Sequence, residues 1–154
     1  MTIKTSSSAV ALGAGLLLAL SACSAQPAGD ASAPLDGQWR MTSLEAGGEG
    51  NYLEVPYSGQ VIFDGDLFSV QASNPDVAAP DTAYTVSGYE AYYGLVDVDE
   101  DEGSFTVEVE NALARDLVGQ TLERRFEVEG DTLVLTPADP SEGWRVTYER
   151  LNAE

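Results

Sequence analysis

Residues 121–135 read TLERRFEVEGDTLVL, and their pattern indicates the fold class of the chain. Its first nine residues alternate with a period of two, so that one face carries Leu122, Arg124, Phe126 and Val128. The other face is polar, which is typical of a β-strand with one buried side. A Gly-Asp pair at 130–131 then precedes TLVLT, and such pairs fit the twist of two-residue hairpin turns. The stretch therefore predicts an antiparallel hairpin.

The same period recurs along the chain. SFTVEVE (104–110) places Phe105, Val107 and Val109 on one face, and WRVTYER (144–150) places Tyr148 with Trp144 and Val146. Asp64-Gly65 marks another hairpin, and the acidic turn DEDEG joins YYGLVDV to SFTVEVE. Only residues 111–119 suggest helix, of one or two turns.

About eight short strands joined by sequential hairpins predict an all-β fold, an antiparallel up-and-down β-barrel. Closure removes the edge strands, and a barrel of this size holds side chains or one small ligand. A β-sandwich is the competing architecture.

Both ends of the strand region carry a recognisable signature. Gly37-Gln38-Trp39 opens the first strand and Arg150 lies near the end of the last. This looks like the lipocalin signature, in which the Arg packs over the Trp at the closed end of the barrel. The segments GQWRMTSLE, GQVIFDGDLFSVQ, YEAYYGLVDVDEDEGSFTVEV, QTLERRFEVEGDTLVL and WRVTYER resemble, in order, the bacterial lipocalin-like domain family. The resemblance implies a lipocalin-like barrel.

The N-terminal residues resemble a secretory targeting signal. Lys4 precedes an uncharged apolar run of about a dozen residues, which suits a secretory signal and is too short to span a bilayer. Leu20-Ser21-Ala22-Cys23 resembles a bacterial lipobox, which implies cleavage before Cys23 and lipidation of that residue. The expected layout is a signal peptide over 1–22, lipidated Cys and a flexible tether over 23–34, and the barrel over 35–154. Ser24 after the lipidated Cys, by resemblance to diderm lipoproteins, implies a lipid-anchored protein of the cell envelope at the outer membrane.

The composition excludes several functions. The mature chain would carry six Arg against 26 Asp and Glu, a formal charge of −20, which disfavours binding to nucleic acid. The sequence has no His, and its single Cys is the predicted lipidation site. Imidazole or thiolate catalysis and the metal sites built on those groups are therefore excluded, and we expect no enzyme, no catalytic residue and no cofactor.

Candidate binding residues lie on the expected inner faces. Arg124 falls on an otherwise apolar face, so it either pairs with an internal carboxylate or Tyr hydroxyl or anchors the carboxylate or phosphate of a ligand. Alternation places Tyr89 and Tyr93 on one face of their strand and Tyr92 on the other. The predicted ligand-binding set is Arg124, Tyr89, Tyr93, Tyr148 and Phe105.

The acidic turn carries Asp97, Asp99 and Asp101 at the spacing of an EF-hand loop, but its Gly stands one position late and strands flank it. We therefore predict no metal site.

Three functional hypotheses remain. The first is an envelope lipoprotein whose barrel binds a small apolar or amphipathic ligand, with the membrane as partner through Cys23. The second is a filled barrel that serves as a structural or interaction protein with an unknown protein partner. The third is an enzyme of the cyclase or isomerase kind.

Overall fold

The chain runs through a succession of antiparallel β-strands joined mostly by short turns. The structure, a computed structural model, describes residues 34–48 and 50–151. These residues form ten strands and two short 3-10 helices. The strands are β1 (Gly37–Gly48), β2 (Asn51–Val55), β3 (Ser58–Asp64), β4 (Leu67–Ser73), β5 (Thr85–Val86), β6 (Tyr89–Asp99), β7 (Ser104–Ala112), β8 (Thr121–Glu129), β9 (Thr132–Pro137) and β10 (Trp144–Arg150); the helices are η1 (Arg115–Leu117) and η2 (Pro140–Glu142).

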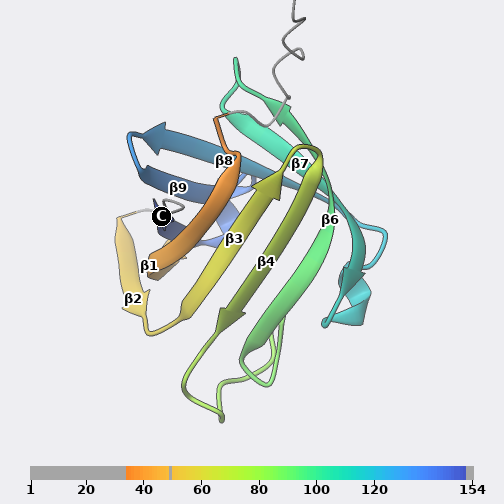
Figure 1. The fold of residues 1–154 in the computed structure, drawn as a ribbon. Helices are drawn as coiled ribbons and strands as arrows, with labels where there is room; N and C mark the ends of the chain where they lie inside the picture. The colour runs from red at the N-terminus through yellow and green to blue at the C-terminus, as the bar shows by residue number, and fades with distance from the viewer. Residues whose placement is uncertain (1–33, 49, 152–154) are drawn as a thin grey trace, which may run out of the picture.

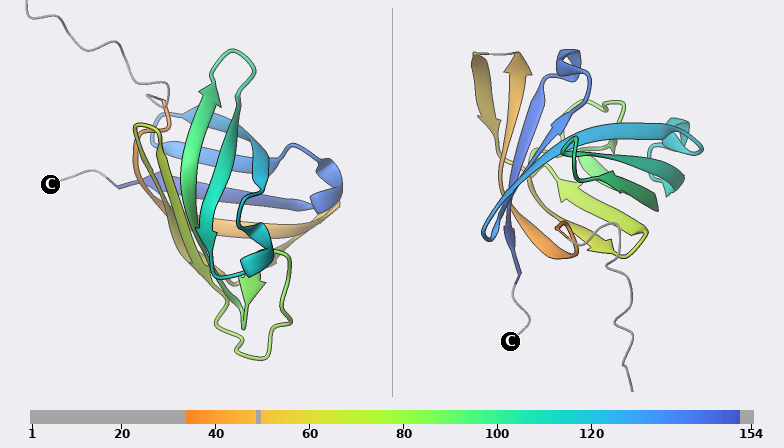
Figure 2. Two further views of the ribbon diagram at one scale, coloured as in Figure 1. Left: turned by 90° about the vertical axis from the view of Figure 1, so that its right-hand side faces the viewer. Right: turned by 90° about the horizontal axis from the view of Figure 1, so that it is seen from above.

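Eight of these strands close into a barrel. Figure 1 and Figure 2 show the strands wrapping around a common interior. The order around the barrel is β1-β3-β4-β6-β7-β8-β9-β10, and β10 pairs back onto β1. The other two strands are additions: β2 pairs with the second half of β1, and β5 pairs with the start of β6. The predicted antiparallel barrel of about eight strands is confirmed, and its closure rules out the sandwich.

The period-two pattern sorts side chains between the interior and the solvent. In β7, Phe105, Val107 and Val109 are buried while Glu108 and Glu110 are exposed. The interior aromatic rings pack edge to face, with the Phe63 centroid 5.2 Å from that of Phe68 and 5.5 Å from that of Phe105. Burying each large apolar side chain stabilises the fold by roughly 1.5–3 kcal/mol, so these faces hold the barrel together.

Two-residue loops connect two of the hairpins. Asp64 pairs with Leu67 and Glu129 pairs with Thr132, which leaves Gly65-Asp66 and Gly130-Asp131 as the loops. Both glycines have φ of 60°, a conformation that side chains with a Cβ rarely adopt. The first loop lies one residue later than the predicted Asp64-Gly65, because Asp64 is still paired.

One end of the barrel is closed by Trp39, which is fully buried. Its indole Nε1 donates to the carbonyl oxygen of Leu35 at 2.7 Å, and the Arg150 guanidinium lies 3.9 Å from the ring centroid. Arg150 also donates to the carbonyl oxygens of Asp36 and, at 3.1 Å, of Pro34. A Cβ at Gly37 would lie 3.1 Å from Arg150 Nη1, so the absence of a side chain at this position allows the guanidinium to pack there. The structure thus brings Gly37, Trp39 and Arg150 together.

Some of the expected features lie outside the described residues. These are the signal peptide expected over 1–22 and the lipidated Cys23 with its tether, of which only residue 34 is described. The last three residues also lie outside the described part. Among the residues that are described, no helix has the length and apolar character needed to cross a membrane. The stretch 111–119 contains a single helical turn, η1, within the predicted range.

Candidate ligand-binding cavity

A cavity of about 570 Å³ occupies the barrel interior on the side away from Trp39. Residues from all eight barrel strands and from β2 and β5 face it, so it belongs to the barrel as a whole. Most of its wall is apolar. The apolar wall residues include Met41, Leu44, Val55, Val61, Phe68, Val70, Phe105, Leu135 and Val146.

The mouth of this cavity lies at the end opposite the Trp39 closure. In Figure 1 the β3–β4 hairpin lies in the upper part of the view and the long loop that follows β4 lies at the bottom. Asn74, Ala79, Pro80 and Thr82 of that loop line the cavity, as does Gly143 of the β9–β10 connection. Two connections from different parts of the chain therefore border the opening.

Arg124 projects from β8 into the cavity and is only 5% exposed. Its Nη2 donates to the Tyr84 hydroxyl at 3.1 Å, and its Nη1 donates to the carbonyl oxygen of Glu123 at 2.9 Å and lies 3.5 Å from Glu142 Oε1. The guanidinium lies 5.4 Å from the Tyr84 ring centroid and 5.1 Å from that of Trp144. Both internal partners considered for Arg124, a carboxylate and a Tyr hydroxyl, are present.

Glu142 is the common partner in this group. The Tyr84 hydroxyl donates to its Oε2 at 2.5 Å, and the Trp144 indole donates to the same oxygen at 3.2 Å. Tyr84 comes from the β4–β5 loop and Glu142 from η2, so Arg124 ties both mouth segments to the barrel wall. We call Tyr84, Arg124, Glu142 and Trp144 the mouth cluster.

Within the cluster, the pKa values of Tyr84 and Arg124 are both raised, for different reasons. Burial raises the pKa of Tyr84, and its hydrogen bond to Glu142 adds to the rise, whereas the Arg124 charge opposes it. Burial alone would lower the pKa of Arg124, but Tyr92, Tyr84 and Glu142 outweigh that effect and raise it. Arg124 therefore stays charged, as an Arg does at any ordinary pH.

Glu90, near the start of β6, is the other carboxyl group that faces the cavity. Burial raises its pKa to about 7, against a smaller lowering by the Arg124 charge. Among the described residues, no hydrogen bond or ion pair engages its side chain. The Glu90 side chain is thus half-buried, and among the described residues its carboxyl has gained no hydrogen bond or ion pair in exchange for the water it has lost.

Tyr148 and Phe105 line the cavity as expected, and Tyr92 does so as well. All three are buried. Burial and the nearby Glu90 charge raise the pKa values of Tyr92 and Tyr148, with Arg124 partly opposing this at Tyr92. Both hydroxyls therefore stay neutral at physiological pH and serve as hydrogen-bonding groups.

Tyr89 and Tyr93 do not line the cavity, which corrects the predicted set. Their side chains are 42% and 50% exposed on the outside of β6. Alternation separates the two faces of this strand correctly, but the inner face is that of Tyr92 and not that of Tyr89 and Tyr93. Counting back in steps of two from the buried Val96 through Gly94 leads to Tyr92 and Glu90, and that signal identifies the inner face.

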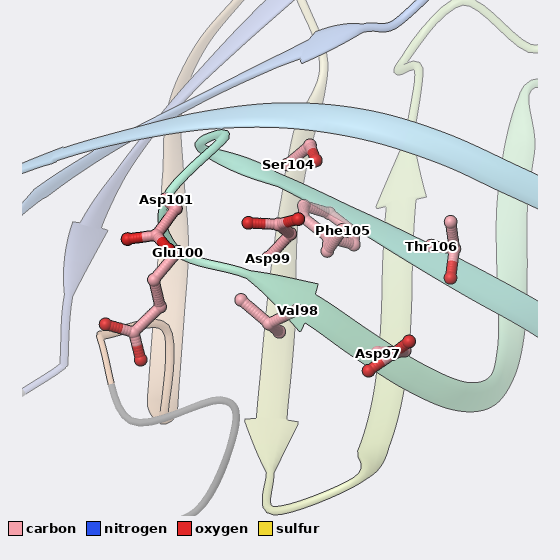
Figure 3. Close-up of a pocket in the computed structure, with 8 residues that line it drawn as sticks. All are labelled: Asp97, Val98, Asp99, Glu100, Asp101, Ser104, Phe105 and Thr106. Atoms are coloured by element: carbon pink, nitrogen blue, oxygen red, sulfur yellow. The ribbon is translucent and has the colours of Figure 1, made fainter.

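The acidic turn forms a separate shallow hollow at the closed end, shown in Figure 3. There the carboxylates of Asp97, Asp99 and Asp101 are spread along the β6–β7 hairpin and do not meet at one point. Asp99 Oδ1 accepts a hydrogen bond from the Glu102 amide at 3.0 Å, as in an ordinary turn. In the described part of the chain, no three His, Cys, Asp or Glu side chains gather as a metal site.

Comparisons with known proteins bear on the fold. An uncharacterised protein from Bacteroides eggerthii has a similar structure, with 14% identity and a TM-score of 0.46 over 75% of this chain and 98% of that one. A REP1-NXSQ fatty acid transporter shows 16% identity and a TM-score of 0.39 over 79% and 99% of the two chains. A point mutant of the fluorescent protein UnaG shows 12% identity and a TM-score of 0.38 over 78% and 98%. All three TM-scores lie below 0.5, so the fold assignment rests on the barrel topology and the family match.

No curated protein matches the sequence. The family model of the lipocalin-like domain matches residues 66–150, which is more than half of the chain and runs from the start of β4 to the end of β10. With the closed eight-stranded barrel, this match shows that the chain belongs to the lipocalin-like domain family.

Proposed function

We propose that the barrel binds a small apolar or amphipathic molecule in its preformed cavity. The observation that carries this proposal is the cavity of about 570 Å³, a volume within the range of roughly 300–1,000 Å³ that small-molecule sites occupy. Its wall is mainly apolar, with a few polar groups near the mouth, which is the composition that such sites share. Burial of apolar surface would supply most of the affinity.

The cavity favours this function over the filled-barrel alternative. Protein interiors pack as densely as organic crystals, and a barrel that serves only as a structural or interaction module gains nothing from an unfilled interior. The cavity is also lined by the polar side chains of Glu90, Arg124 and Glu142, whereas a chance packing defect in the core would be lined by apolar groups alone. Ligand binding accounts for both features together.

We further propose that the domain holds its ligand without transforming it. The chain has no His, and Arg124, the cation that is buried among the described residues, is engaged by Tyr84 and Glu142. Lipidation at Cys23 would attach the domain to the cell envelope, at the outer membrane of a diderm bacterium, through the tether.

Native mass spectrometry of the barrel domain purified from its host tests the binding function. An added mass that disappears on denaturation is expected, and uptake of the neutral probe Nile red by the stripped domain provides a second readout. Val70 faces the cavity and the adjacent Gln71 faces solvent, so Val70→Phe should reduce probe uptake while the matched control Gln71→Phe should not. A native domain that carries no ligand and takes up no Nile red would overturn the proposal.

A further inference from the structure

We propose that the ligand is an amphipathic molecule with a basic nitrogen, and that the Glu90 carboxylate pairs with that cation inside the cavity. This inference rests on the proposed binding function and adds the chemical class of the ligand. Four observations carry it. Arg124 already pairs with Glu142 and Tyr84, and Glu90 has no hydrogen bond or ion pair among the described residues. Glu90 also lies near the mouth, and its ionised form leaves the cavity with a net negative charge.

Arg124 is not free to take an anion. Its guanidinium already contacts the Glu142 carboxylate at 3.5 Å and the Tyr84 hydroxyl at 3.1 Å, and it lies between the Tyr84 and Trp144 rings. A ligand carboxylate would have to displace Glu142 and leave that carboxylate without its counter-charge. The polar group expected from sequence to anchor an acid is therefore neutralised within the protein.

Glu90 is the charged group lining the cavity for which the described residues provide no hydrogen bond or ion pair. The titratable groups that surround it are Arg124 from β8, Tyr92 from β6, Tyr148 from β10 and, in the mouth cluster, Tyr84 and Glu142. The tyrosines are neutral, and Arg124 balances Glu142, so an ionised Glu90 leaves one net negative charge in the cavity. Glu90 is half-buried, and a charge with little contact to water is normally paired, so one bound monovalent cation would restore the balance.

The position of Glu90 suits the headgroup of an amphiphile. It pairs in register with Ala72 of β4 and Thr85 of β5, beside the loop that borders the mouth. Farther inside, the wall consists of Val61, Phe68 and Phe105. A ligand with its apolar part against these residues would bring its polar end to Glu90.

The surroundings also favour a cation over an anion. Aromatic rings attract ammonium groups through their faces, and Tyr92 and Tyr148 line the cavity near Glu90. The whole chain carries a formal net charge of −19, which draws cations toward it and slows the approach of anions. Electrostatics at short and long range therefore select the same ligand class.

Titration of Glu90 gives the pairing a pH dependence. In the ligand-free cavity its pKa is about 7, so the carboxyl is mostly neutral at pH 6 and mostly ionised at pH 8. An alkylamine keeps its proton across this range. Binding of the amine should therefore strengthen from pH 6 to pH 8, while binding of a neutral alcohol should not change.

The test uses three probes with one tail, namely decylamine, decanol and decanoate, each competing with Nile red for the barrel domain. Wild type at pH 8 is expected to bind decylamine roughly tenfold tighter than decanol, equivalent to about 1.4 kcal/mol, and decanoate more weakly than either. Glu90→Gln should abolish the preference for the amine and keep the affinity for decanol. The matched control Glu108→Gln removes the same charge from the outer face and should retain the preference.

Each outcome decides one of the two proposals. Equal binding of decylamine and decanol, or an amine preference that Glu90→Gln retains, overturns the role of Glu90 while the binding function stands. Preferred binding of decanoate overturns it as well. Failure of wild type to take up Nile red and decanol overturns the binding function itself. Wild type alone gives an independent check if the variant does not fold, because an amine-to-alcohol ratio that is unchanged from pH 6 to pH 8 contradicts the inference.

Discussion

Glu90 and Glu142 both face the same cavity, yet their surroundings differ. Glu142 accepts hydrogen bonds from Tyr84 and Trp144 and pairs with Arg124, so its charge is well compensated. Glu90 has no such contacts among the described residues, and burial raises its pKa to about 7. The partners around each residue, and not its type, decide whether it contributes to stability or is available to a ligand.

Replacing Glu90 with Gln should therefore stabilise the ligand-free domain, increasingly so at higher pH. The pKa rises from 4.5 in the unfolded chain to about 7 in the fold, so the folded state holds the extra proton and loses stability as the pH rises through this range. From this difference the advantage of Glu90→Gln should grow from under about 1 kcal/mol at pH 5 to roughly 2–3 kcal/mol at pH 8. Urea unfolding at several pH values measures it.

Glu108→Gln is the control for this experiment, because it makes the same change of charge on the exposed outer face of β7. An advantage of Glu90→Gln that is independent of pH, or that shrinks as the pH rises, would show that the carboxyl is solvated or paired in the fold.

Arg150 combines several contacts in one side chain at the closed end. Arg150→Leu removes the contact with the Trp39 ring and the hydrogen bonds to the Pro34 and Asp36 carbonyl oxygens. We expect a loss of about 2–3 kcal/mol in the free energy of unfolding, since each contact contributes of order 1 kcal/mol. Arg145→Leu is the comparison, because Arg145 pairs with Glu45 on an exposed surface where ion pairs contribute little. Equal effects of the two substitutions would contradict the assigned role of Arg150.

At the scale of the strands, the contact between β6 and β7 depends on a glycine. The register shifts between Tyr93 and Gly94, where β7 has one residue more than β6. A Cβ at Gly94 would lie 1.9 Å from the carbonyl oxygen of Glu108, a distance that no packing can accommodate. The bulge and the glycine therefore belong together.

Gly94→Ala should separate β6 from β7 locally and destabilise the barrel by at least about 2–3 kcal/mol, in the range of severe single substitutions. The matched control is Gly48→Ala at the end of β1, where an added Cβ would meet nothing within 4 Å. Thermal unfolding compares the two, and similar melting temperatures would show that β7 can move away from Gly94 at little cost.

The mouth segments form a second element-scale unit, held by the mouth cluster. Tyr84→Phe removes the hydroxyl that joins Arg124 to Glu142, so the loop at 74–84 should open more often. Hydrogen exchange followed by mass spectrometry should show its amides exchanging several-fold faster, with the barrel strands unchanged. Tyr57→Phe provides the control, since Tyr57 lines the cavity without a side-chain hydrogen bond in the described structure. Unchanged exchange at 74–84 in Tyr84→Phe would mean that other contacts hold the loop.

The sequence predicts strands better than it predicts partners, for a physical reason. Alternation is local, so β7 and β8 and the burial of Arg124 follow from residues next to each other in the chain. The partners of Arg124 come from residues 84, 142 and 144, which only the closed barrel brings together. The sequence does not single out Glu90, because an isolated Glu beside a run of tyrosines resembles a surface residue unless the inner face of β6 is counted back from Val96.

For the whole molecule, the proposed attachment at Cys23 makes a prediction of its own. Cys23→Ala should move the protein from the membrane fraction to the soluble fraction, because loss of the acyl chains removes the anchor. Ser24→Ala, next to the lipidation site, should remain with the membranes. Membrane fractionation followed by immunoblotting distinguishes the two, and a Cys23→Ala protein that still sediments with membranes would overturn the anchoring proposal.

The way in which Arg150 holds Pro34 has a consequence for how such a protein would work. The chain enters the barrel at the closed end, whereas the mouth lies at the opposite end. In the anchored protein that we propose, the flexible tether would join the domain at its base, so the opening would lie at the end farthest from the attachment point. Cargo would then arrive from the aqueous side and not laterally from the lipid layer, and each exchange would require neither detachment nor reorientation of the domain.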